Sequence, residues 1–93
     1  MNDKTNRLSE LLHQAAETHH TVFANMDGED PDWATWYADW LVNLSPLPEL
    51  LGTRPVRSEL TYLLVGLDNE YVQARPNEPW EVFYAARLMQ HLS

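Results

Sequence analysis

The chain has 93 residues, a net charge of −8 and 44% hydrophobic residues, which suits one domain with its own core and is too short for two. The negative charge argues against binding to nucleic acid or to an anionic membrane surface, because both need a basic face. The absence of cysteine excludes disulfides and thiolate metal sites. Residues 1–7 are polar and no apolar run approaches the ~20 residues of a membrane span, so we expect a cytoplasmic protein.

Residues 6–26 carry apolar side chains three and four positions apart, which is the spacing of a helix. Thr5 or Asn6 can cap its start, and Gly28 follows its expected end. The apolar face comprises Leu8, Leu11, Leu12, Ala15, Ala16, His19, Val22, Phe23 and Met26. One polar ring, that of His19, therefore stands within this face.

A second helix is expected over residues 31–44, with Asp30 as its cap and Pro31 at its first position. Its apolar stripe comprises Trp33, Trp36, Tyr37, Trp40, Leu41 and Leu44. A helix this apolar is expected to be the most buried one or to meet a partner chain. Residues 49–51 then form a short turn before Gly52.

The third helix is expected over residues 55–74, capped by Thr53 or beginning near Pro55. Gly66 in its interior costs ~1 kcal/mol against alanine and suggests a close helix crossing. A fourth helix follows over residues 78–92, with an inner stripe of Trp80, Phe83, Tyr84, Arg87, Leu88 and His91. No segment alternates apolar and polar residues over strand lengths, so we predict an all-α domain.

The second and fourth helices share a motif. Tryptophan, an aromatic residue, tyrosine, alanine and leucine recur with identical spacing at five positions, in Trp33-x-x-Trp36-Tyr37-Ala38-x-x-Leu41 and Trp80-x-x-Phe83-Tyr84-Ala85-x-x-Leu88. Because tryptophan and tyrosine are rare, we interpret this as an internal duplication. The prediction is a single domain over residues 1–93, a four-helix bundle of two repeated hairpins at about residues 6–44 and 55–92.

The segment Asp-Pro-Asp-Trp-x-x-Trp-Tyr-Ala-x-x-Leu, which includes Trp33 and Leu41, also resembles one found in small, functionally uncharacterised bacterial helical proteins. The resemblance covers about residues 15–41, with a weaker echo at residues 78–88. It implies no activity and no catalytic residue.

Two histidines and the two repeated tyrosines are expected on inner helix faces. His19, Tyr37, Tyr84 and His91 could together line a central polar pocket that binds a small ligand or acts as acid and base. Alternatively, each polar tip finds a neighbour while its ring packs in the core. Under the duplication, His19 corresponds to Asp68 and Trp40 to Arg87, so these four residues mark where the copies differ and where a site should be sought.

Metal sites are not favoured by the sequence. Glu10, His13, Glu17 and His20 have the Glu-x-x-His spacing of di-iron bundles, but they lie opposite the apolar face and no other helix repeats the motif. The residual interpretation is a weak zinc or nickel site on the helix surface through His13, Glu17 and His20. The acidic residues 27–32 have no calcium-loop spacing and serve as caps. We expect no metal and no cofactor.

The tryptophans leave two interpretations open. Trp33, Trp36 and Trp40 either pack in the core or reach the surface as anchors of a protein contact. The favoured hypothesis is a small, acidic, non-catalytic interaction module with a protein partner or a homodimer. The alternative is a small-ligand-binding bundle or weak enzyme around the central pocket.

Overall fold

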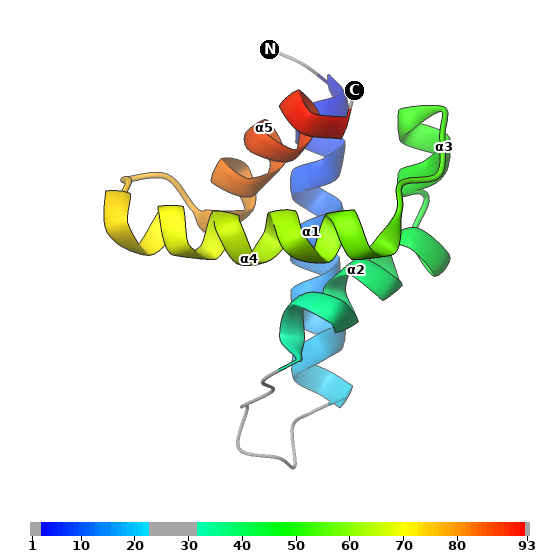
Figure 1. The fold of residues 1–93 in the computed structure, drawn as a ribbon, viewed down its shortest axis with the longest axis horizontal. Helices are drawn as coiled ribbons and strands as arrows, with labels where there is room; N and C mark the ends of the chain where they lie inside the picture. The colour runs from blue at the N-terminus through cyan, green and yellow to red at the C-terminus, as the bar shows by residue number, and fades with distance from the viewer. Residues whose placement is uncertain (1–2, 23–31, 93) are drawn as a thin grey trace.

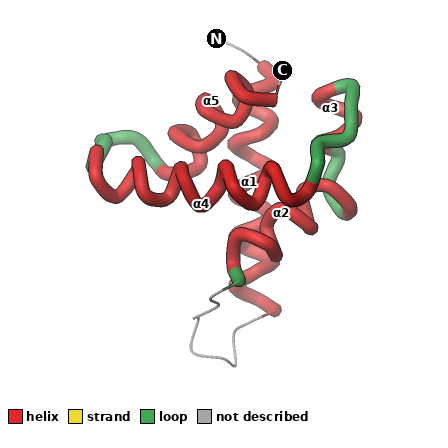
Figure 2. The backbone as a smooth tube through the Cα atoms, viewed as in Figure 1, coloured by secondary structure: helices red, strands yellow, loops and turns green. Residues whose placement is uncertain are grey.

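A computed structural model of the chain describes residues 3–22 and 32–92, which form five helices and contain no strand (Figures 1 and 2). The helices are α1 (Asp3–Val22), α2 (Trp33–Asn43), α3 (Leu47–Leu51), α4 (Arg57–Ala74) and α5 (Trp80–Leu92). The all-α prediction is therefore confirmed, and the expected short turn at residues 49–51 is part of α3. The expected end of the first helix at about residue 26, the expected cap Asp30 and the expected first helical residue Pro31 lie outside the described residues.

The helices cross at steep angles rather than running along one common axis (Figure 1). The most extensive contacts join α1 with α5 and α2 with α4, and smaller ones join α1 with α2 and α4 with α5. A twofold axis that exchanged the two expected hairpins would relate α1 to α4 and α2 to α5. Such an axis would also exchange the α1–α5 contact with the α2–α4 contact, which are the two most extensive ones. The duplication itself stays a prediction.

A leucine core holds the four long helices together. The largest fully buried side chains are Leu8, Leu11, Leu12, Leu41, Leu47, Leu60, Leu64 and Leu88. They come from all five helices, so the short α3 also contributes to the core through Leu47. No polar or charged residue of the described chain is fully buried, and aromatic side chains pack around this core at partial exposure.

Two expectations about α4 are wrong. Its N-cap is Val56 in an extended conformation, so Thr53 does not cap the helix. The helix begins at Arg57, two residues after Pro55, as the alternative of a start near Pro55 predicted. Apart from its chain neighbours and the nearby backbone of α4 itself, no atom lies within 4 Å of the place where a Cβ on Gly66 would stand. The expected close crossing at Gly66 does not form, because α4 buries the opposite face.

Candidate functional site

Six side chains from three helices line an open pocket of about 320 Å³ between α2, α4 and α5. Each helix contributes two residues one turn apart, which places both on the same face. The set, called the aromatic pocket below, comprises Trp33 and Tyr37 of α2, Asp68 and Tyr71 of α4, and Trp80 and Tyr84 of α5. Five of the six are aromatic, and Asp68 is the one charged residue of the lining.

The rings of the aromatic pocket meet edge to face. Tyr37 lies 5.8 Å from Trp33 and 6.3 Å from Trp80, measured between ring centroids, at interplanar angles of 87° and 66°. The centroid of Tyr84 lies 5.1 Å from Trp80 and 6.3 Å from Tyr71, at 75° and 78°. This is the arrangement that aromatic pairs prefer. It joins the rings of three helices into one continuous wall.

Two of the tyrosine hydroxyls of the pocket donate hydrogen bonds. The hydroxyl of Tyr84 donates to Oδ1 of Asp68 at 3.3 Å, and that of Tyr71 donates to the carbonyl oxygen of Glu78 at 2.9 Å. Burial raises the pKa of Tyr84, and the nearby carboxylate of Asp68 raises it further. The pKa of Tyr37 is also raised, first by burial and then by the negative charge of Glu81. Both tyrosines therefore stay protonated at neutral pH.

Only part of the expected central pocket forms. Tyr37, Tyr84 and Asp68 line the aromatic pocket. His19 does not line it, and its ring centroid lies 5.0 Å from that of Trp36 and 5.4 Å from that of Tyr37. His91 is exposed near the end of α5 and lines a separate hollow against α4, so its expected inner position is wrong. The buried face of α5 continues from Leu88 towards residue 92 instead.

The positions where the two expected copies differ do not come together. Arg87 lies 4.6 Å above the ring of Phe83, and its Nε is 3.7 Å from a carboxylate oxygen of Glu70. Trp40 lines a shallow hollow between α1 and α2. Of the residues His19, Asp68, Trp40 and Arg87, only Asp68 lines the aromatic pocket.

The four tryptophans are neither core nor free surface. Trp33, Trp36, Trp40 and Trp80 are all partly exposed, and three of them, all except Trp36, are packed against the leucine core. Leu44, expected in the same stripe, is 72% exposed at the C-cap of α2. Trp33 and Trp80 line the aromatic pocket, so half of the tryptophans are placed to contact a ligand.

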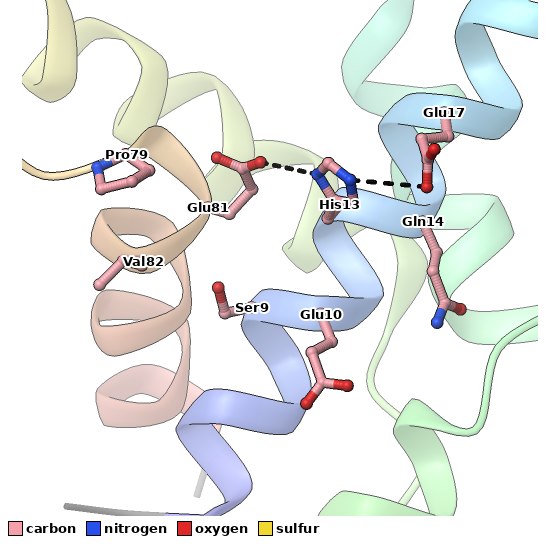
Figure 3. Close-up of a pocket in the computed structure, with 8 residues that line it drawn as sticks. All are labelled: Ser9, Glu10, His13, Gln14, Glu17, Pro79, Glu81 and Val82. Carbon is pink, nitrogen blue, oxygen red and sulfur yellow. Dashed lines mark hydrogen bonds and ion pairs between the residues drawn. The ribbon is translucent and has the colours of Figure 1, made fainter.

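A second hollow, of about 440 Å³, lies between α1 and α5 around His13 (Figure 3). Figure 3 shows the imidazole between two carboxylates, Glu17 on its own helix and Glu81 reaching across from α5. Nδ1 of His13 lies 3.0 Å from Glu81, and Nε2 lies 3.5 Å from Glu17. The hydrogen bond to Glu81 and the charge of Glu17 raise the pKa of His13. This arrangement joins two helices through a surface ion pair.

The surface metal site expected as a residual interpretation does not assemble. Among residues 3–22 and 32–92, no three histidine or acidic side chains are placed to hold a metal ion. His13 turns to Glu81 instead, and His20 has no part in the hollow. No helix of the described residues is long and apolar enough to cross a membrane.

Two residues of these hollows were not predicted from the sequence: Tyr71 of the aromatic pocket and Glu81 beside His13. Tyr71 stands three residues after Asp68, so helical spacing alone could have added it to the candidate face. Glu81 is 68 residues away from His13, and no periodicity predicts a contact across that distance.

Comparisons of the chain with protein-family models, curated proteins and solved structures give no match. The aromatic pocket is therefore identified by its geometry alone.

Proposed function

We propose that the protein is a small non-catalytic interaction module that binds a basic segment of a partner protein at the aromatic pocket. The observation that carries the proposal is the pocket itself: five aromatic rings and one carboxylate that open to the surface. Partly exposed tryptophan and tyrosine side chains are the commonest energetic anchors of protein interfaces. Their rings are already fixed by mutual contacts, so binding orders few side chains.

Charge favours a basic partner. The chain carries a net charge of −8, and the lining of the pocket has Asp68 as its charged group. Glu81 adds negative potential near Tyr37. Such a field accelerates the approach of cationic segments and disfavours acidic ones.

The chemistry of the pocket does not favour catalysis. Tyr37 and Tyr84 have raised pKa values and remain protonated, so neither can take up a proton at neutral pH. His19, which was expected to line a central pocket, does not line the aromatic pocket. The lining therefore offers mainly aromatic surface for contact, with Asp68 as its one carboxylate and no histidine.

A small-ligand bundle is the second candidate. The volume of about 320 Å³ is at the lower end of the range for ligand sites, which begins at about 300 Å³. This observation suits a compact ligand or one side chain of a protein. The two candidates predict different outcomes in one peptide experiment.

The test is a peptide array that compares lysine- and arginine-containing segments with acidic and neutral segments of equal length. Wild-type protein is expected to bind basic peptides, and Trp80→Ala is expected to lose most of that binding. Trp40→Ala is the matched control, because it removes a partly exposed tryptophan outside the pocket. Equal binding by both variants would contradict the proposal, as would equal binding of acidic peptides. Circular dichroism checks that each variant is folded.

A further inference from the structure

We infer that the aromatic pocket binds a trimethylammonium group, carried by a methylated lysine or by a small quaternary amine. This inference names the ligand of the site and rests on the proposed function. It follows from three properties of the pocket: the aromatic rings, the carboxylate and the small number of hydrogen-bond acceptors in the lining.

The ring faces come first. A cation is attracted to an aromatic face when it lies within about 6 Å of the ring centroid, and tryptophan and tyrosine are the better partners. Trp33, Tyr37, Trp80 and Tyr84 follow one another with centroid separations of 5.1–6.3 Å and interplanar angles of 66–87°. Rings turned in this way have faces in different directions, and all four line the same pocket, so a rounded cation there can contact more than one ring.

The carboxylate supplies the charge. Asp68 receives one hydrogen bond from Tyr84, at the long distance of 3.3 Å, and forms no ion pair within the described part of the chain. Nearby Arg87 is paired with Glu70 instead. The negative charge of Asp68 is thus left without a cation beside the aromatic wall. A bound cation would neutralise it in a partly desolvated site.

Hydrogen bonding selects the kind of cation. A primary ammonium or a guanidinium gives up several hydrogen bonds to water on entering the pocket and needs acceptors in return. The carboxylate of Asp68 can accept from one or two of these N–H groups, but the remaining lining is mostly aromatic ring, so a primary ammonium or a guanidinium keeps donors without an acceptor. A trimethylammonium group has no N–H to satisfy, and its methyl groups can pack on the rings. The pocket therefore favours the methylated form over unmodified lysine or arginine.

The test measures the affinity of the full chain for four probes by isothermal titration calorimetry. Three probes are small molecules: tetramethylammonium, choline and the neutral choline isostere 3,3-dimethylbutan-1-ol. The fourth is one short lysine peptide, measured in two forms, with the lysine trimethylated and unmodified. Both quaternary ions are expected to bind, the neutral isostere at least about tenfold more weakly, and the trimethylated peptide at least about tenfold more tightly than its unmodified form.

Variants locate the effect. Asp68→Asn keeps the shape of the pocket and removes its charge, and is expected to weaken the binding of tetramethylammonium about tenfold. Glu59→Gln removes the same charge from an exposed position of the same helix outside the pocket and is expected to leave the affinity unchanged. Trp80→Phe keeps an aromatic face and is expected to retain more affinity than Trp80→Leu.

The outcomes separate the inference from the proposed function. Binding of quaternary ions without binding of any peptide would support the inference and overturn the interaction module in favour of a small-ligand site. Binding of the unmodified lysine peptide as tightly as the trimethylated one would overturn the inference and keep the interaction module. Equal affinity for choline and its neutral isostere, or equal loss in Asp68→Asn and Glu59→Gln, would overturn the inference.

Discussion

Replacing Tyr84 by phenylalanine is expected to make folding less sensitive to alkaline pH. Tyr84 is 5% exposed, and burial and the Asp68 carboxylate raise its pKa above the ordinary value of 10.0. The unfolded chain therefore loses this proton first, so the stabilising contribution is complete below about pH 10 and is lost as the pH rises towards the raised pKa. One proton corresponds to a slope that approaches about 1.4 kcal/mol per pH unit in the free energy of unfolding.

At neutral pH the same substitution removes one hydrogen bond, from the hydroxyl to Oδ1 of Asp68 at 3.3 Å. Its net loss is about 0.5–1.5 kcal/mol, so Tyr84→Phe starts less stable than wild type. The two stability curves are expected to converge at about pH 11. At that pH, proton linkage has lowered the unfolding free energy of wild type by about as much as the lost hydrogen bond lowers that of the variant. Urea unfolding followed by circular dichroism from neutral to alkaline pH measures both effects.

The matched control is Tyr62→Phe, because Tyr62 is 77% exposed and meets solvent in both the folded and the unfolded state. Its stability curve is expected to run parallel to that of wild type. If Tyr84→Phe also runs parallel to wild type above about pH 10, the hydroxyl of Tyr84 is not held in a buried, negatively charged environment. The described geometry of the aromatic pocket would then be wrong.

Three further predictions concern the frame around the pocket. Leu88→Ala, which empties a fully buried position, is expected to lower the free energy of unfolding by about 2–5 kcal/mol in urea titrations. Gly66→Ala is expected to raise the free energy of unfolding by up to about 1 kcal/mol, since the added Cβ enters open space. Gly52→Ala is expected to lower it by about 1–2 kcal/mol, because φ is 76° there. Stabilisation by both substitutions would contradict the described backbone at Gly52. Because the pKa of His13 is raised, its ion pairs stabilise the fold below about pH 6.5, and this contribution is lost as the pH rises through the raised value. The thermal midpoint of Glu81→Gln is therefore expected to depend less on pH between about 5 and 8 than that of wild type.

The helices were predictable because burial follows the helical period. Leu8, Leu11, Leu12 and Ala15 repeat at three and four positions, and all four are buried in α1. The helical period predicts burial less well at the ends of helices, where a small rotation of the helix changes which side chains face the core. His91 and Leu92 are adjacent, and the core accepts the leucine while the histidine stays exposed.

The candidate site was predictable in part. Tyr37 and Tyr84 were expected on inner faces, and Asp68 was singled out by the duplication; all three line the aromatic pocket. The contacts of α2 and α5 with α4 bring their tryptophans and tyrosines together around Asp68, and the crossing angles of helices are not encoded in the spacing along one helix. For the same reason, the ion pair between His13 and Glu81 had no sequence signal.

The most direct test of the account is nuclear magnetic resonance of the protein with tetramethylammonium chloride. Nuclear Overhauser effects are expected between the methyl protons of the ion and ring protons of Trp33, Trp80 and Tyr84, with shifts of the indole N–H signals of these two tryptophans. The indole signals of Trp36 and Trp40 are expected to stay in place, since neither lines the pocket. Contacts with those two rings instead, or none at millimolar concentrations of the ion, would contradict the assignment of the aromatic pocket as a cation site.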